Sequence, residues 1–204
     1  MQPDSEVIEA LFKDLEDEDH TVRETGAYRL GELAAECFQL SRSTLRDDKS
    51  LSVTNCLASE TTRNAVAQAL IKLLCDQDPW VRGNAAEALG KLQDASAVEF
   101  LIKASQDEEA IVRFSAVEAL GELKAEVAID ALIEQLKDSE WSVRLSAVKA
   151  LGNIGSVSAC DALAKAQKDP KHAIRVLAKE AVAQIQDASR GISKSNASLE
   201  SSVI

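Results

Sequence analysis

The sequence predicts an all-α protein, built as an α-solenoid of about five short helical hairpins. The first observation behind this prediction is repetition: the segment DPWVRGNAAEALGKL, which begins at Asp78, returns in four variant copies within 204 residues. The second is composition. Hydrophobic residues, mostly Ala and Leu, make up 46% of the chain and aromatic residues only 3%, which favours closely packed helices over strands.

Every copy contains one arginine, and the last four arginines lie 31 residues apart. A period of this length is typical of repeat arrays, in which each unit packs only on its neighbours and no globular domain boundary exists. We expect repeat units at about residues 4–36, 64–94, 95–125, 126–156 and 157–187, and a flexible Ser-rich tail at 188–204. The five arginines are Arg23, Arg82, Arg113, Arg144 and Arg175.

The second helix of each unit is predicted by apolar residues at helical spacing around the arginine. Positions are counted from this arginine, so that +1 is the residue after it. Apolar residues recur at −1, +3, +7 and +10 and form one helical stripe. Asp78–Pro79 and Asp169–Pro170 predict N-caps followed by proline in the first turn, where a missing N–H costs nothing. Glycine recurs at +8 inside the helix and predicts the close approach of a neighbouring helix, at Gly31, Gly90, Gly121 and Gly152.

The first helix of each unit is predicted by apolar pairs upstream, such as Leu101–Ile102, and it ends in a short acidic turn. Each arginine has an aspartate six residues before it, in this turn. The guanidinium, at the edge of the stripe, can reach the turn carboxylates and bridge successive units bidentately. We interpret the five arginines as a structural ladder; the alternative, an anion-binding row, is disfavoured by the local acids.

The period breaks once, because Arg23 and Arg82 lie 59 residues apart. The extra residues fall at about 37–63, and we interpret them either as an accessory binding arm or as a disordered spacer.

A candidate protein-binding surface follows from position +1, which points away from the apolar stripe. Large apolar residues occupy it in the last three units, on the side that is concave in such arrays, and charged residues at +5 border them. The alternative is lateral packing between successive inner helices. Trp80 and Trp141, at the hairpin turns, are predicted either as rim contacts or as staples of those turns to the core. The predicted row is Phe114, Leu145 and Val176, with Glu87, Glu118 and Lys149 beside it.

Composition and motifs exclude several classes of function. A net charge of −11 without a basic run argues against a nucleic-acid surface. No apolar run approaches membrane-spanning length and no leader pattern is present, so we expect a cytoplasmic protein that does not enter a membrane. The cysteines lack zinc spacing, and His20 and His172 hold the same position in the first and last units, too far apart to share a metal. No metal, cofactor or catalytic residue is therefore expected.

The unit D-x-[DE]-x-x-V-R-x-x-A-[AV]-x-A-L-G-x-[LI], present whole or nearly so at Asp76, Asp107 and Asp138, resembles the short HEAT-like repeat. It is most similar to the repeats of phycobilin lyase subunits of the E/F type and of related phycobilisome assembly or degradation proteins. The resemblance covers about residues 4–36 and 64–187; Arg29 in the first unit and Ala183 in the last depart from it, as end units commonly do.

This resemblance implies a right-handed solenoid and a non-catalytic scaffold that binds another protein on its concave face, in phycobilisome assembly or turnover. The implied partner is a phycobiliprotein or a second lyase-type subunit. The alternative that it implies is a bilin lyase subunit, which attaches a tetrapyrrole to phycobiliprotein cysteines. Deoxyhypusine hydroxylase, a catalytic HEAT-like family, carries iron-binding His-Glu pairs, and this chain has no His-Glu dipeptide.

Overall fold

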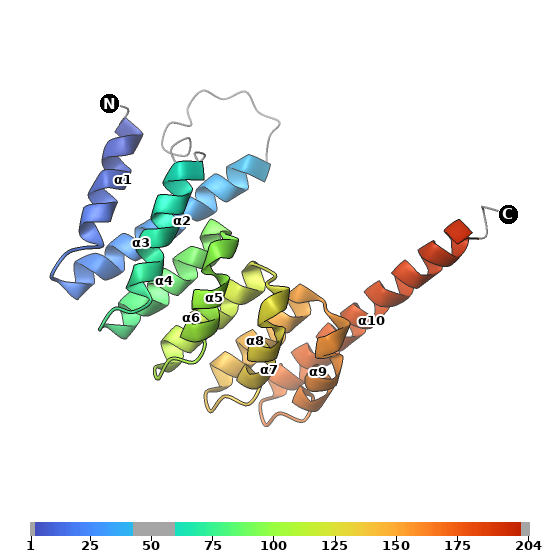
Figure 1. The fold of residues 1–204 in the computed structure, drawn as a ribbon. Coiled ribbons are helices and arrows are strands. Elements are labelled where there is room, and N and C mark those ends of the chain that lie inside the picture. The colour runs from blue at the N-terminus through green and yellow to red at the C-terminus, as the bar shows by residue number, and fades with distance from the viewer. Residues whose placement is uncertain (1–2, 43–59, 201–204) are drawn as a thin grey trace. The chain divides into compact units, whose positions relative to one another are not determined.

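The structure, a computed structural model, describes the backbone of residues 3–42 and 60–200, all of whose regular elements are helices. The chain divides into two compact units, Met1–Leu123 and Lys124–Ile204. Both units consist of antiparallel helical hairpins placed side by side (Figure 1). The predicted fold class is confirmed: the protein is an all-α solenoid with five hairpins in its described residues.

Unit 1 contains three hairpins. Within it, the second helices pack on one another in the order α2, α4, α6, and each first helix packs on the second helix of its own hairpin. The elements are α1 (Pro3–Asp14), α2 (His20–Arg42), α3 (Glu60–Leu73), α4 (Pro79–Leu92), the 3-10 turn η1 (Ala95–Ala97), α5 (Val98–Ala104) and α6 (Ala110–Glu122).

Unit 2 contains two hairpins that follow the same plan. The second helices α8 and α10 pack on each other, α7 packs on α8, and α9 packs on α10. The elements are η2 (Glu126–Ala128), α7 (Ile129–Gln135), α8 (Trp141–Ile154), η3 (Val157–Ala159), α9 (Cys160–Ala166) and α10 (His172–Glu200).

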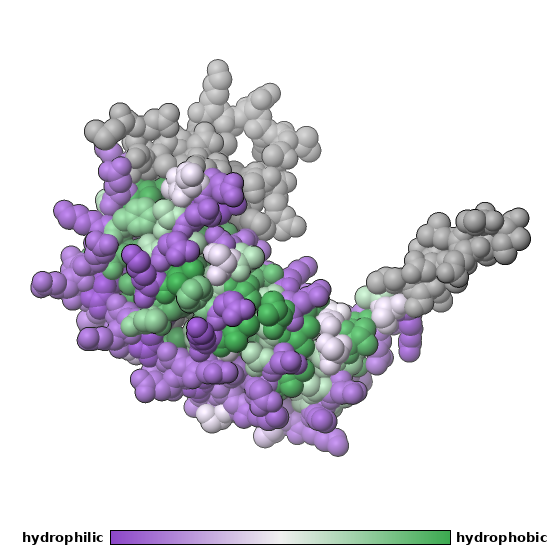
Figure 2. All heavy atoms as spheres, viewed as in Figure 1, coloured by the Kyte–Doolittle hydropathy of each residue, from purple (hydrophilic) through white to green (hydrophobic). Residues whose placement is uncertain are grey.

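Two layers of helices result in each unit, and the core lies between them. We call the second helices the inner layer and the first helices the outer layer. The predicted stripe forms the core: leucine at +7 and alanine at +3 are fully buried in most hairpins, as at Leu89, Ala85, Leu151 and Ala147. In both units, hydrophilic side chains gather along the edge formed by the hairpin turns, and hydrophobic ones show between the helices (Figure 2).

Gly31, Gly90 and Gly152, three of the four glycines predicted at +8, lie where inner helices touch. A Cβ atom built on Gly90 would lie 2.8 Å from Cα of Ala119, and one on Gly31 would lie 3.1 Å from Cα of Ala88. In unit 2, a Cβ on Gly152 would lie 3.2 Å from Cβ of Ala181. Each of these junctions therefore has room for the methyl group of the alanine but not for a second one.

Only one of the two predicted N-caps is correct. Asp78 caps α4 by accepting hydrogen bonds from the N–H groups of Trp80 and Val81, with Pro79 in the first turn. The prediction for Asp169 is wrong, because α10 begins at His172. Asp169 stands at −6 rather than −4, so its carboxylate accepts instead from the N–H of Lys171 inside the turn, at 2.8 Å.

The C-terminal segment and the borders of the predicted insertion are helical. From residue 188 the sequence predicts a flexible tail, but α10 continues to Glu200 without a break. The predicted insertion is helical at both borders, in α2 up to Arg42 and in α3 from Glu60, and residues 43–59 lie outside the described residues. Cys75 is exposed and Cys160 is half-buried. In the described residues, no helix is long and apolar enough to cross a membrane.

Candidate functional site: the arginine ladder and the inner layer

The arginine at each turn holds two hairpins together. In unit 1, Arg23 donates from Nε and Nη2 to Asp76 at 2.7 and 2.9 Å, and Arg82 donates in the same way to Asp107, at 2.8 Å for both bonds. In unit 2, Arg144 donates to Asp169 at 2.7 and 3.3 Å. Each of these three arginines thus binds the aspartate of the following hairpin with a bidentate fork.

The third guanidinium nitrogen faces the arginine's own turn. Nη1 of Arg82 donates to the carbonyl oxygens of Asp76 and Gln77 at 2.9 and 3.1 Å, which lie at the end of the first helix of the same hairpin. The same two bonds recur at the other four arginines. One planar cation therefore satisfies turn carbonyls within a hairpin and, at the three forks, an acid of the next one.

The three fork acceptors have pKa values below the usual range for aspartate. For Asp76 the main cause is the hydrogen bonds from Arg23. For Asp107 and Asp169, burial is the largest single effect and would raise the pKa, but the hydrogen bonds from Arg82 or Arg144, the backbone hydrogen bonds and the nearby arginine charges together lower it. These carboxylates are therefore ionised and committed to the ladder at neutral pH.

The predicted apolar row is only partly accessible. Val176 on α10 is 42% exposed, whereas Leu145 on α8 and Phe114 on α6 are half-buried. Leu145 and Val176 lie on helices that pack on each other in unit 2. Phe114 belongs to unit 1, and of the predicted charged border Glu87 and Lys149 are exposed while Glu118 is half-buried.

The inner layer of unit 1 carries an acidic strip, of which the sequence predicted only Glu87 and Glu118 as a charged border. The strip consists of Glu32, Glu87, Glu118 and Glu122 around Lys91. Lys91 on α4 lies 2.6 Å from Glu32 on α2 and 2.8 Å from Glu87 on its own helix, and its ammonium is 5.6 Å from the ring centre of Tyr28. Tyr28 is 50% exposed. Charged residues recur at +5 and +9, four positions apart on one helix face, as at Glu87 and Lys91. This spacing could have revealed the strip from the sequence.

At the α6 end of the strip, the pKa of Glu122 is raised, first because its carboxylate is partly removed from solvent and then because Glu118 lies close. The Glu122 carboxylate rests over Gly90, where a Cβ atom would come within 2.9 Å of its Oε2. The carboxylates of Glu32, Glu87 and Glu122 therefore lie around Lys91, and this part of the inner layer holds more acidic than basic side chains.

Both tryptophans at the turns lie on the surface. Trp80 is 55% exposed and Trp141 is 45% exposed. The Trp141 ring stacks under the ammonium of Lys171, 5.6 Å from the ring centre, at the neighbouring turn of unit 2. About half of each side chain is therefore accessible to a partner, while the other half packs on the protein.

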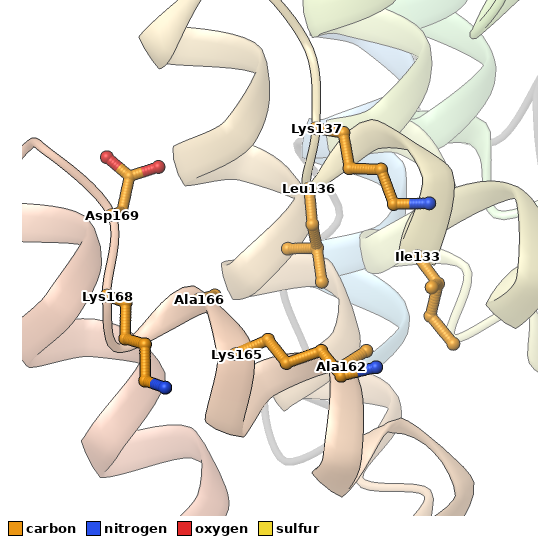
Figure 3. A pocket seen from close by; sticks show the side chains of 8 residues that line it. All are labelled: Ile133, Leu136, Lys137, Ala162, Lys165, Ala166, Lys168 and Asp169. Atoms are coloured by element: carbon orange, nitrogen blue, oxygen red, sulfur yellow. The ribbon is translucent and has the colours of Figure 1, made fainter.

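The outer layer of unit 2 contains a pocket of about 320 Å³ between α7 and α9 (Figure 3). Its floor is apolar, and three lysines line it, of which Lys165 and Lys168 make no ion pair with any described residue. The Asp169 carboxylate, also at this pocket, already binds Arg144. The lining residues are Ile133, Leu136, Lys137, Ala162, Lys165, Ala166, Lys168 and Asp169.

Comparison with known families finds matches to the model described as HEAT repeats. Three overlapping matches cover residues 53–121, 67–143 and 98–183, which together make up more than half of the chain. No curated protein sequence matches this chain.

Solved structures show the same fold at low sequence identity. The complex of CpcE and CpcF of phycocyanin lyase from Nostoc sp. PCC7120 is 23% identical, with a TM-score of 0.69, over 88% of this chain and 65% of that chain. An engineered protein is 20% identical, with a TM-score of 0.52, over 89% of this chain and 97% of that one. Human deoxyhypusine hydroxylase in complex with glycerol is 20% identical, with a TM-score of 0.52, over 90% of this chain and 75% of that one. This chain spans about two-thirds of the length of the lyase chain that it matches.

Proposed function

The chain belongs to the HEAT-repeat family, and on this premise we propose that it is a non-catalytic scaffold that binds another protein through its inner layer. The observation that carries the proposal is the exposure of Val176, an apolar side chain at +1 of the inner helix α10 that is 42% accessible, whereas Ile174, Ala178 and Ile185 of the stripe on the same helix are buried. Position +1 is apolar on both inner helices of unit 2, at Leu145 and Val176, with Lys149 and Glu180 beside it at +5, and Phe114 holds the same position on α6 of unit 1. An apolar strip with a charged border is the usual composition of a protein-binding surface.

The exposed tryptophans, one in each unit, are further candidates for contacts with a partner. Trp and Tyr are enriched among residues that dominate binding energy, because they bury large areas and lose little conformational entropy. Trp80 and Trp141 stand at the turns that border the inner layer, and we assign them as rim contacts. The ladder arginines hold the hairpins in register but do not belong to the binding surface.

The proposed binding surface is tested by Val176→Glu. Because Val176 is already exposed, the charge should change the melting temperature little, yet it should prevent an apolar partner from docking. The matched control is Val157→Glu, since Val157 is 62% exposed in the outer turn of the same unit.

The measurement is thermal melting together with affinity capture from the native organism, using wild type and both variants. We expect a partner that wild type and Val157→Glu retain and Val176→Glu loses, with all three proteins folded. Equal capture by all three would remove the inner layer from consideration. Recovery of a phycobiliprotein, or of a second repeat subunit, would place the scaffold in phycobilisome assembly or turnover, as the likeness to the phycocyanin lyase complex suggests.

A second candidate function is that of a bilin lyase subunit. It is favoured by the pocket of unit 2, whose apolar floor and three lysines suit an apolar molecule that carries carboxylates, such as a tetrapyrrole. If this is correct, mixing a free bilin with the protein should change the absorbance spectrum of the bilin, and the change should be weaker with the Lys165→Glu variant. Lys149→Glu, an exposed lysine on the inner layer of the same unit, is the control that should leave the spectrum unaffected.

A further inference from the structure

Arg175, the last arginine of the ladder, is not joined to an aspartate of a following hairpin within the described residues. Arg175 donates from Nη1 to the carbonyl oxygens of Asp169 and Pro170, at 2.9 and 3.0 Å, as the other ladder arginines do at their own turns. In Arg82 and Arg144, the Nε and Nη2 edge holds the aspartate of the following hairpin. Among the residues that the structure describes, no acceptor faces this edge of Arg175. The guanidinium is therefore oriented to receive a carboxylate that this part of the chain does not supply.

The first hairpin contains a turn aspartate, Asp17, of the kind that the ladder arginines bind in the other hairpins. Asp17 stands at −6, and its Oδ1 accepts a hydrogen bond from the N–H of Asp19 at 2.9 Å. Within the described ranges, no arginine side chain donates to its carboxylate. Charge alone would thus allow two copies of the chain to join head to tail through Arg175 of one copy and Asp17 of the other.

The contact between inner helices opposes such a self-association. At each described junction, a glycine at +8 faces an alanine at +6 of the next inner helix, and Gly90 has no room for a methyl group against Ala119. On α10, the position of the glycine holds Ala183, and on α2 the position of the alanine holds Arg29; both are exposed. A second copy in ladder register would bring the Arg29 side chain onto Ala183, where the other junctions accept a single methyl group.

We propose that the exposed face of α10 around Arg175 and Ala183 docks the acidic turn of a helical hairpin from a different protein. The facing helix of that partner carries glycine where the inner helices of this chain carry alanine or arginine, because Ala183 already supplies the one methyl group that fits. The binding mode continues the interface that joins the hairpins within each unit, with the alanine and the glycine exchanged.

Charge supports an acidic occupant. On this face, Lys179 stands at +4 of α10 and is exposed, whereas the earlier inner helices bury alanine or valine at this position, as at Ala86, Val117 and Val148. The turn aspartate of the last hairpin, Asp169, is already neutralised by Arg144. Arg175 and Lys179 therefore place positive charge on this face of α10, which favours and orients the approach of an acidic turn.

The proposal is tested with this chain as its own probe, through the variant Arg29→Gly. This variant gives the first hairpin both features of the proposed partner, an open turn aspartate and a glycine on the facing helix. We expect it to associate head to tail, with a mass in sedimentation that rises with protein concentration and falls with salt. Arg29→Ala removes the same charge but places a second methyl group against Ala183, so it should remain a monomer, as should wild type.

Two double variants identify the contacts. Arg29→Gly with Arg175→Gln should weaken the association by about tenfold or more, as loss of a bidentate ion pair implies. In the double variant Arg29→Ala, Ala183→Gly, the new contact again pairs one alanine with one glycine, as the junctions within the chain do. This double variant should therefore associate. Circular dichroism and thermal melting establish that each variant is folded, which the exposure of positions 29 and 183 favours.

Several outcomes would overturn the proposal. A monomeric Arg29→Gly protein at the highest soluble concentration would show that the face does not receive a hairpin. Equal association of Arg29→Gly and Arg29→Ala would refute the requirement for glycine, and insensitivity to Arg175→Gln would refute the role of the fork. Self-association of wild type through Arg175 would identify a second copy, rather than a different protein, as the occupant.

Discussion

At the scale of single residues, the ladder arginines differ in how many partners they hold, and this difference predicts their effects on stability. Arg82 is 8% exposed and binds both oxygens of Asp107 as well as two carbonyl oxygens. Arg82→Ala removes the charged donor shared by these acceptors and leaves Asp107 only the N–H of Glu109, so it should lower the free energy of unfolding by about 1–3 kcal/mol. Arg175→Ala, which loses only the two carbonyl contacts, should cost clearly less. Thermal and urea unfolding of both variants measure the difference, and equal losses would assign the stabilisation to the turn carbonyls alone.

The same residues predict how stability depends on pH. Since the pKa of Asp107 is lower in the folded than in the unfolded state, its contribution is fully present above the unfolded pKa of about 4 and is lost as the pH falls towards the folded pKa. The stability difference between wild type and Asp107→Asn should therefore be largest near pH 7 and shrink below pH about 4. Urea unfolding at a series of pH values checks this, and a difference that is independent of pH would show that the charge of Asp107 does not contribute.

At the scale of helices, two glycines of α4 predict opposite outcomes for one substitution. A Cβ on Gly90 would meet the Ala119 backbone at 2.8 Å, whereas one on Gly83 would find only ordinary contacts, the nearest at 3.6 Å. Gly90→Ala should force α4 and α6 apart and destabilise by about 1–3 kcal/mol. Gly83→Ala should be neutral or stabilising by up to about 1 kcal/mol, because alanine favours the helix. Thermal melting compares them, and a stabilised Gly90→Ala would mean that the helices separate easily.

The helices also show how far the sequence alone reaches. Residues that recur at the same position in most copies are the ones that pack between helices, so the leucine at +7 and the glycine at +8 could be predicted without a structure. Features that vary among copies could not be predicted in this way. Asp169 has the same Asp-Pro sequence as Asp78 but stands two positions earlier relative to its arginine. Its side chain therefore binds Lys171 and Arg144 instead of capping α10. The accessibility of the +1 row also lay beyond the pattern, because it depends on how closely each pair of inner helices packs.

At the scale of the whole molecule, charge is distributed unequally between the units. Residues 1–123 contain 24 acidic and 12 basic residues, whereas residues 124–204 contain 10 and 11. This asymmetry was available in the sequence, but only the unit boundary gives it a structural meaning. The inner layer of unit 1 is acidic around Lys91, and the last hairpin of unit 2 exposes lysines, so a basic partner is favoured by one unit and an acidic partner by the other.

The two units should also differ in their ability to fold alone. A HEAT-like hairpin cannot bury its own apolar face, and stability grows with each neighbour that stacks on it, so that about three repeats are needed. Residues 1–123 contain three hairpins joined by two ladder forks, at Arg23 and Arg82, and should retain helical circular dichroism and a cooperative melt. Residues 124–204 contain two hairpins and one fork, at Arg144, and should melt at lower temperature with a broad transition. If the two-hairpin fragment melted as high and as sharply as the three-hairpin fragment, the stability of this array would not arise from neighbour contacts.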